Sequence, residues 1–204
     1  MTRVTISMAA AACFAGGCAS SPPIHYYILS ESAADARLTT APGVVPVRLE
    51  RVTVPNELDR SELVRRIDAT RVQIVEGSRW AAPLDDMIRR VLSGDLAARL
   101  PPGEVADPNE PALGEPRQSL SVDVQEFYGD ATCAVTLRAA WVLRQPDSQS
   151  VRAREEVRIA SGSACSGNDS LPAAMSQALG QLSDRIAAAV ARTHGAAGQE
   201  SEHY

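Results

Sequence analysis

The sequence predicts an α+β sandwich: one mixed, largely antiparallel β-sheet with two long helices packed on one face. Two observations support this prediction. Four segments, at 44–54, 120–128, 133–143 and 151–159, alternate apolar and polar residues as half-buried strands do. Two others, at 84–100 and 171–192, repeat apolar residues every three or four positions, which is typical of helices packed against a core. We expect residues 26–192 to form a single domain.

The chain begins with the pattern of a secretory signal, which we assign to residues 1–17. Arg3 supplies a short positive region, an uncharged and mostly apolar run follows to Ala15, and two glycines lead into Cys18. A membrane-spanning helix is not expected, because it needs ~20 consecutive apolar residues and this run is shorter.

The residues before Cys18 resemble a bacterial lipobox, in which the cysteine is acylated and becomes the new N-terminus. Ala15 stands where that motif usually has leucine, and Cys13 is a competing acceptor. We favour lipidation at Cys18, with residues 18–25 as a tether; the alternative is an ordinary secreted protein cut nearby. Several acyl chains together give stable membrane anchoring. Ala19 rather than aspartate, by resemblance to sorted bacterial lipoproteins, suggests the outer membrane.

Composition argues against several classes of function. The chain has 20 basic and 25 acidic residues, so binding to nucleic acid through bulk positive charge is not expected. Its three histidines, at 25, 194 and 203, lie near the predicted tether or in the tail, where none would serve a metal site or a Ser-His-Asp hydrolase. The sequence has neither a glycine-rich phosphate loop nor a CxxC motif. We therefore predict no metal, no cofactor and no catalysis.

The first strands are short. A strand-like run covers 26–29, and the apolar phase of 44–54 slips by one residue, which predicts a bulge near Arg51. Pro46 cannot donate to a ladder and should lie at an edge or a strand start. A turn follows at 55–60.

Between that turn and the first long helix, residues 62–68 are expected to be extended or briefly helical. The next strand, 71–76, should point Val72 and Ile74 inward and end at Gly77. Pro83 then suits the first turn of the helix 84–100. Residues 101–118 contain five prolines and two glycines and are interpreted as a loop insertion.

The two long strands at 133–143 and 151–159 both place their odd-numbered apolar residues on one face, with Glu155 as the exception. If a three-residue loop at 147–149 joins these strands as a hairpin, residues that lie opposite each other have numbers that sum to 296. That register places Cys165 diagonally opposite Cys133, and we predict a structural disulfide, with two free thiols as the alternative.

The last predicted helix, 171–192, follows cap candidates at 167–170 and carries Pro172 in its first turn. Its apolar stripe is expected to pack on the sheet, and residues 193–204 are expected to form a disordered tail.

The order of several short motifs resembles the PqiC/YmbA lipoproteins, the auxiliary lipoprotein components of MCE-type ABC transport systems. The matching residues are Tyr-Tyr-Ile-Leu at 26–29, Val-Pro at 54–55, Leu-Asp-Arg at 58–60, Glu-Leu-Val-Arg-Arg at 62–66 and Arg-Trp-Ala-Ala-Pro-Leu at 79–84. The weak lipobox and the insertion at 101–118 depart from the family pattern.

The resemblance implies a periplasm-facing outer-membrane lipoprotein that acts as a non-catalytic adaptor or receptor. Its partners would be a periplasmic MCE-domain protein and that protein's ABC transporter, in a system that carries lipid between two membranes and supports membrane integrity. Association with further copies of this chain, as a homo-oligomer, is left open. The alternatives are a standalone periplasmic lipid- or ligand-binding lipoprotein, and a periplasmic hydrolase.

Five residues are candidates for a partner-binding patch: Leu58, Asp59, Arg60, Arg79 and Trp80. Tryptophan and arginine are over-represented in binding hot spots. The competing interpretation is structural, with Asp59 paired to Arg79 and Trp80 filling the core beside the first helix.

Overall fold

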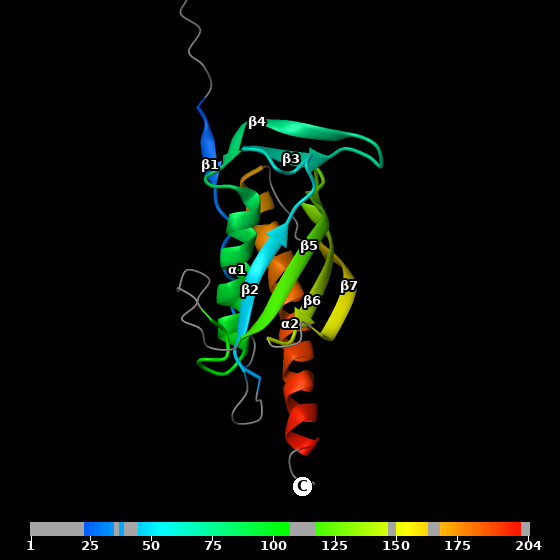
Figure 1. Ribbon diagram of the computed structural model, residues 1–204. Helices are drawn as coiled ribbons and strands as arrows, with labels where there is room; N and C mark the ends of the chain where they lie inside the picture. The colour runs from blue at the N-terminus through cyan, green and yellow to red at the C-terminus, as the bar shows by residue number, and fades with distance from the viewer. Residues whose placement is uncertain are drawn as a thin grey trace, which may run out of the picture.

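The computed structural model describes residues 23–34, 37–38, 45–106, 117–146, 150–162 and 168–200. They form an open, mixed seven-stranded sheet with two helices on one face, which confirms the predicted fold class (Figure 1). The strands run in the order β1-β4-β3-β5-β6-β7, and β2 pairs with β5 along the edge that β3 also contacts. The elements are β1 (His25–Tyr27), β2 (Val47–Thr53), β3 (Glu62–Arg66), β4 (Val72–Trp80), α1 (Leu84–Arg99), β5 (Gln118–Gly129), β6 (Ala134–Arg144), β7 (Val151–Gly162), a 3₁₀ turn (Asn168–Ser170) and α2 (Leu171–Glu200).

The long antiparallel strands have the register that the sequence predicted. Ala134 lies opposite Gly162 and Leu143 opposite Ala153, so the paired numbers sum to 296 along the strands until a shift at Arg144. The odd-numbered side chains of β6 are buried under the helices, and Leu137 and Trp141 are among the largest fully buried side chains of the described residues. Alternation with a period of two was therefore sufficient to fix both faces of these strands.

The predicted irregularity in β2 is also confirmed. The register of β2 against β5 shifts between Leu49 and Arg51, which leaves Glu50 as the extra residue of a bulge. Pro46 lies directly before the strand, and its carbonyl oxygen accepts a hydrogen bond from the Gln118 amide at 2.8 Å.

The β3–β4 hairpin differs from the prediction. Val72 and Ile74 are 47% and 44% exposed, and the neighbouring Val75 is buried instead. This hairpin extends from the end of the sheet, past the region that the helices cover (Figure 1). An alternating sequence distinguishes the two faces of a strand, but it does not show whether the helices cover either face.

Gly77 does not end β4, which continues to Trp80. The glycine has a φ of +70°, and a Cβ at this position would lie 3.1 Å from the Pro23 carbonyl oxygen. The residue therefore bends the strand and lets the incoming N-terminal chain approach closely.

Both helices bury the predicted stripes. In α1 the apolar residues repeat every three or four positions and lie in the core, together with two charged residues, Asp95 and Arg99. In α2 the stripe from Leu171 to Val190 is buried, and the helix continues to Glu200, past the expected end at Arg192. The prediction of a tail from 193 was wrong for this stretch, where alanines favour continued helix despite two glycines.

The chain after β1 crosses the two helices as an N-terminal strap, residues 29–34 and 37–38. Leu29 is buried in the core, and the Ser30 amide donates to Ser176 Oγ of α2 at 3.1 Å. Further along, the Ser32 amide donates to Asp95 Oδ1 of α1 at 2.7 Å, and the Leu38 amide donates to the Arg99 carbonyl at 2.7 Å. The strap therefore fastens the N-terminal chain to the helix layer.

Some predictions fall partly on undescribed residues. The signal, Cys13 and Cys18 lie outside the described residues, as do 107–116 of the insertion, the loop 147–149 and the end of the tail. The described start of the insertion is ordered against β2, because the Val47 amide donates to the Glu104 carbonyl and Ala106 is buried.

Candidate partner-binding site

The turn after β2 and the start of α1 together form a small surface pocket of about 320 Å³. Its lining comes from two chain segments: Asp59, Arg60 and Ser61 in the turn, and Trp80, Ala81, Ala82 and Pro83 between β4 and α1. The Trp80 amide donates to the Ser61 carbonyl at 2.7 Å, which joins the two segments directly. Three of the five predicted patch residues, Asp59, Arg60 and Trp80, are thus brought to one place.

The five candidates nevertheless divide into core and surface. Leu58 is 3% exposed and Trp80 is 5% exposed, and both belong to the hydrophobic core. Asp59 and Arg60 are exposed, and Arg79 is half-buried. Trp80 can therefore offer only a small part of its surface to a ligand, and the polar groups of the patch are those of the turn.

No ion pair links Asp59 to Arg79 within the part of the chain that the structure describes. Arg60 Nε instead contacts Glu62 Oε2 at 3.2 Å, and Glu62 lies opposite Arg79 in the β3–β4 ladder. These contacts lower the pKa of Glu62, first through its own backbone amide and then through Arg60. The carboxylate therefore stays charged and holds the Arg60 side chain beside the pocket.

The turn that carries Asp59 and Arg60 is fixed to the sheet at Glu57. The Tyr128 hydroxyl of β5 donates to Glu57 Oε1 at 3.0 Å, and the Arg66 guanidinium lies 4.5 Å from the centre of the Tyr128 ring. Arg66 also contacts Glu126 at 3.1 Å. Burial, and then the hydrogen bond to Glu57, raise the pKa of Tyr128 to about 12. Sequence reasoning missed this network, since its members are far apart in the chain.

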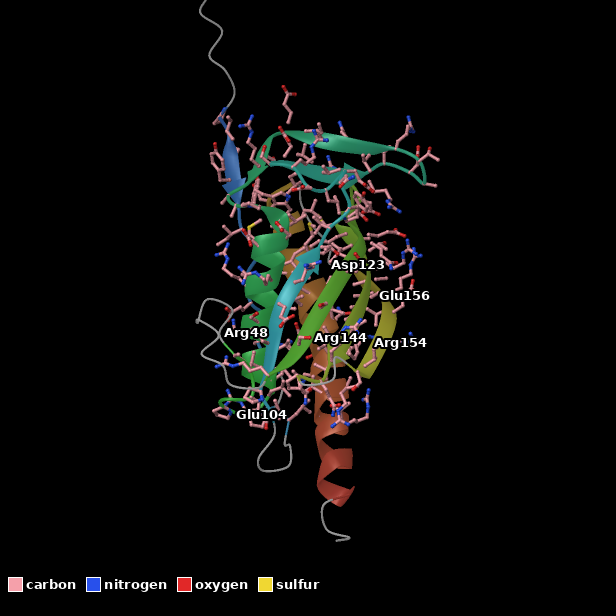
Figure 2. The ribbon with its side chains drawn as sticks, in the orientation of Figure 1. Arg48, Glu104, Asp123, Arg144, Arg154 and Glu156 are labelled. Carbon is pink, nitrogen blue, oxygen red and sulfur yellow. The ribbon has the colours of Figure 1, made fainter. Side chains whose placement is uncertain are left out.

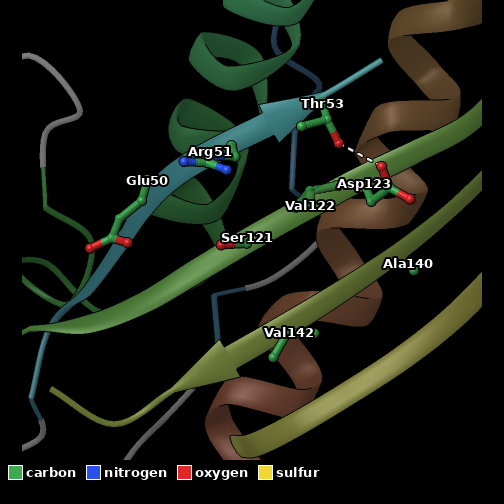
Figure 3. Close-up of a pocket in the computed structure, with 8 residues that line it drawn as sticks. All are labelled: Glu50, Arg51, Thr53, Ser121, Val122, Asp123, Ala140 and Val142. Carbon is green, nitrogen blue, oxygen red and sulfur yellow. Dashed lines mark hydrogen bonds between the residues drawn. The ribbon is translucent and has the colours of Figure 1, made fainter. Parts of the chain in front are cut away.

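A second pocket of about 400 Å³ lies on the sheet face that the helices leave uncovered (Figure 3). The Thr53 hydroxyl donates to Asp123 Oδ1 at 2.5 Å across its floor. The lining residues are Glu50, Arg51, Thr53, Ser121, Val122, Asp123, Ala140 and Val142.

The rest of the uncovered face carries charges of both signs. Figure 2 shows Asp123, Arg144, Arg154 and Glu156 along strands β5 to β7. Next to them, Arg138 contacts Glu126 at 3.0 Å and Glu156 at 3.8 Å. Such interspersed pairs are typical of a hydrated sheet face rather than of a binding site for one charged ligand.

Cys133 is buried in the turn between β5 and β6, with a φ of 57°. Asp130 Oδ1 accepts hydrogen bonds from the Thr132 amide at 2.7 Å and the Ala134 amide at 3.1 Å, which holds this left-handed turn. Its predicted partner Cys165 lies outside the described residues, so the disulfide stays a prediction.

The described residues include no cluster of three or more His, Cys, Asp or Glu side chains that could hold a metal ion. The pocket lined by residues 59–61 and 80–83, called the partner pocket from here on because it is the candidate site for a partner, offers an apolar floor with one acid and one arginine at its rim. Its lining has neither a histidine nor a cysteine. Such a surface can receive a side chain or a short segment of another protein. Neither described helix is long and apolar enough to cross a bilayer.

Comparison with known proteins gives a consistent result. Residues 27–187 match the family described as the ABC-type transport auxiliary lipoprotein component. Two relatives, each named intermembrane transport lipoprotein PqiC, come from Escherichia coli K12 and Shigella flexneri. Each is 31% identical over 134 residues, which cover 65% of this chain and 70% of the relative.

Solved structures share the fold. A crystal structure of an uncharacterized protein superposes with a TM-score of 0.67 at 24% identity and covers 81% of this chain and 97% of that one. A second, from Xanthomonas campestris, has a TM-score of 0.63 at 19% identity and covers 88% and 100%.

Proposed function

Because the chain belongs to the family of ABC-type transport auxiliary lipoprotein components, we propose that it is the non-catalytic adaptor of an intermembrane lipid-transport system. In this proposal the chain is acylated at Cys18, is anchored to the outer membrane and faces the periplasm. It docks there onto an MCE-domain protein that belongs to an ABC transporter and carries phospholipid between the membranes. The observation that supports this most strongly is the family match, which spans the folded part of the chain from β1 to α2.

The docking site we propose is the partner pocket with its charged rim. Asp59 and Arg60 project from a turn that is held at both ends by hydrogen bonds. The Tyr128 hydroxyl donates to Glu57 before them, and the Trp80 amide donates to the Ser61 carbonyl after them. A preorganised turn loses little conformational entropy on binding, which favours its use as a recognition element. Arg60 is 40% exposed, so a partner carboxylate can reach it while it keeps Glu62 as a neighbour.

Co-purification from detergent extracts tests this function. We expect the tagged, acylated chain to capture an MCE-domain protein, identified by mass spectrometry, and Arg60→Glu to reduce the capture at least tenfold. Arg192→Glu makes the same charge change on an exposed position of α2 and should leave the capture unchanged. Absence of any MCE-domain protein from wild-type extracts would contradict the adaptor function, whereas equal capture by both variants would place the docking site elsewhere.

The main alternative is a standalone lipid-binding lipoprotein. A carrier needs an enclosed apolar cavity, whereas the two pockets described above both open to solvent. Native mass spectrometry that finds one phospholipid retained by the isolated chain would favour the carrier.

A further inference from the structure

Exposed apolar side chains gather at one end of the fold. Seven large apolar residues in the described part of the chain are exposed, and six of them belong to the N-terminal segment around β1 or to the β3–β4 hairpin. The seventh, Val151, begins β7. The six are Ile24, Tyr26, Ile28, Ile67, Val72 and Ile74.

These two groups lie on the same end of the molecule. β1 runs parallel to β4, with His25 opposite Ser78 and Tyr27 opposite Trp80. The hairpin continues from there to its tip, and Figure 1 shows β1, β3 and β4 together at the end of the fold opposite to the C-terminal end of α2. We call this end the β1–hairpin face.

The distance along the chain keeps this face close to the anchor. Ile24 follows Cys18 by six residues, and an extended chain spans at most ~3.6 Å per residue, which limits the separation to about 22 Å. The Pro23 carbonyl also lies directly against Gly77 of β4, so the tether enters the fold at this face and not at another. With the acyl chains in the membrane, the β1–hairpin face is the part of the domain nearest to the lipid.

The charges of the hairpin also suit a lipid surface. The hairpin, residues 62–80, carries four arginines and three acids, whereas the whole chain has fewer basic residues than acidic ones. At the tip, Asp68 accepts hydrogen bonds from the amides of Thr70 and Arg71, both at 2.9 Å, and from Arg71 Nε at 2.6 Å. The one carboxylate of the tip is therefore satisfied by the tip's own donors, including the Arg71 guanidinium. This lowers the desolvation free energy that Asp68 costs when the tip approaches the lipid headgroups.

We propose that the β1–hairpin face is a membrane-contacting surface that rests on a phospholipid bilayer and places Ile67, Val72 and Ile74 at the boundary between the headgroups and the acyl chains. This inference rests on the lipid anchor of the proposed function and adds a second, weaker attachment. Aliphatic side chains beside arginines are typical of interfacial contacts, because the guanidinium groups remain at the headgroup level while apolar groups enter deeper. An anchor combined with such a face orients the domain and directs α2 away from the membrane.

Tryptophan quenching by brominated phospholipid tests the proposal. The acylated chain, with its acyl mass verified, is reconstituted into vesicles of phosphatidylethanolamine and phosphatidylglycerol at three to one that contain brominated acyl chains. Val72→Trp is compared with Val151→Trp, a matched control, because the two valines are 47% and 48% exposed. We expect at least twofold quenching of the residue-72 tryptophan emission over the wild-type background and none at residue 151.

Two results would overturn the inference. Equal quenching at both positions would mean that the anchored domain has no preferred face, and no quenching at residue 72 would mean that the hairpin stays away from lipid. If residue 72 is not quenched, a blue shift of its tryptophan emission that grows with the amount of protein per vesicle would assign the face to contact with a second copy of the chain. The double variant Val72→Asp/Ile74→Asp, checked for folding by circular dichroism, should also lose the protection of the hairpin from protease that vesicles give to the wild type. Neither readout involves the MCE-domain protein, so failure here is distinct from failure of the capture experiment.

Discussion

Replacing Arg99 by methionine should destabilise the domain strongly. The Arg99 side chain is 4% exposed and lies beside Asp95, which is fully buried, with 3.6 Å between Nη1 and Oδ1. Arg99 Nη2 donates to Ser32 Oγ at 3.0 Å, and Nε donates to Asp184 Oδ1 at 2.5 Å. The cation therefore balances a buried carboxylate and also holds the strap against both helices.

The size of the destabilisation follows from the buried Asp95 carboxylate, which Arg99→Met leaves without its cation. Methionine keeps most of the aliphatic volume, so the cavity contribution is small. The remaining carboxylate at position 95 loses its cation, and breaking a buried pair in this way costs about 3–5 kcal/mol. Since domains of this kind are stable by only about 5–15 kcal/mol, the variant should lose a large share of its folding free energy. Urea unfolding followed by far-UV circular dichroism measures the change.

The double variant Asp95→Asn/Arg99→Met separates charge from packing. Asparagine can still accept the hydrogen bond that the Ser32 amide donates to Oδ1 at 2.7 Å, but it needs no cation. We expect the double variant to be at least about 1 kcal/mol more stable than Arg99→Met alone. Arg192→Met, on the exposed side of α2, should change stability by no more than about 0.5 kcal/mol. The reasoning is refuted if Arg99→Met costs under about 1 kcal/mol, or if the double variant gains nothing over the single one.

The same site has a predictable pH dependence. Burial raises the pKa of Asp95, and the Ser32 hydrogen bond and the Arg99 charge offset only part of that effect. A carboxyl with a folded pKa above its unfolded value binds its proton more tightly in the folded state, so protonation favours folding. Without Arg99 the pKa of Asp95 in the folded state rises further. The loss of unfolding free energy in Arg99→Met, relative to the wild type, should therefore shrink as the pH falls from about 7 toward 4.

Two other predictions follow from the site and the strap. Folding raises the pKa of Tyr128 from the ordinary tyrosine value of 10.0 to about 12. Its contribution to stability is therefore complete below pH 10.0 and is lost as the pH rises toward 12. Alkaline unfolding curves should show this loss in the wild type and not in Tyr128→Phe. Gly180→Ala places a methyl group against Ser32 Oγ, so it should destabilise the domain by about 1–3 kcal/mol in urea unfolding, and an unchanged midpoint would show that the strap adjusts freely.

Sequence reasoning succeeded for the long strands and helices, whose apolar residues recur with a single period and all pack into the same core. The odd parity of β6 and β7 predicted their buried faces, and parity together with an assumed three-residue loop predicted their mutual register. The stripe of α2 was buried as expected. It failed at the hairpin, because alternation in β4 marks two faces and only tertiary structure decides whether either of them is covered. Val72 and Ile74 are exposed for that reason.

The candidate site shows a related limit. Trp80 and Leu58 stood out as large apolar residues beside turns, but such residues most often fill the core, and here both do. The buried Asp95 was visible in the sequence as a charge within the apolar stripe of α1, between Val91 and Leu96. Its partners could not be inferred, since Ser32 and Asp184 reach it from distant parts of the chain, directly or through Arg99.

The parallel pairing of β1 with β4 has a mechanical consequence for a protein held by its N-terminus. When the chain before β1 is pulled along the axis of that strand, the slanted hydrogen bonds between the parallel strands β1 and β4 are loaded in shear. The load is then shared by all the bonds of β1 at once instead of opening them one after another. Next along the chain, the hydrogen bonds that fasten the N-terminal strap, residues 29–34 and 37–38, to α1 and α2 would have to break before tension reached the centre of the sheet.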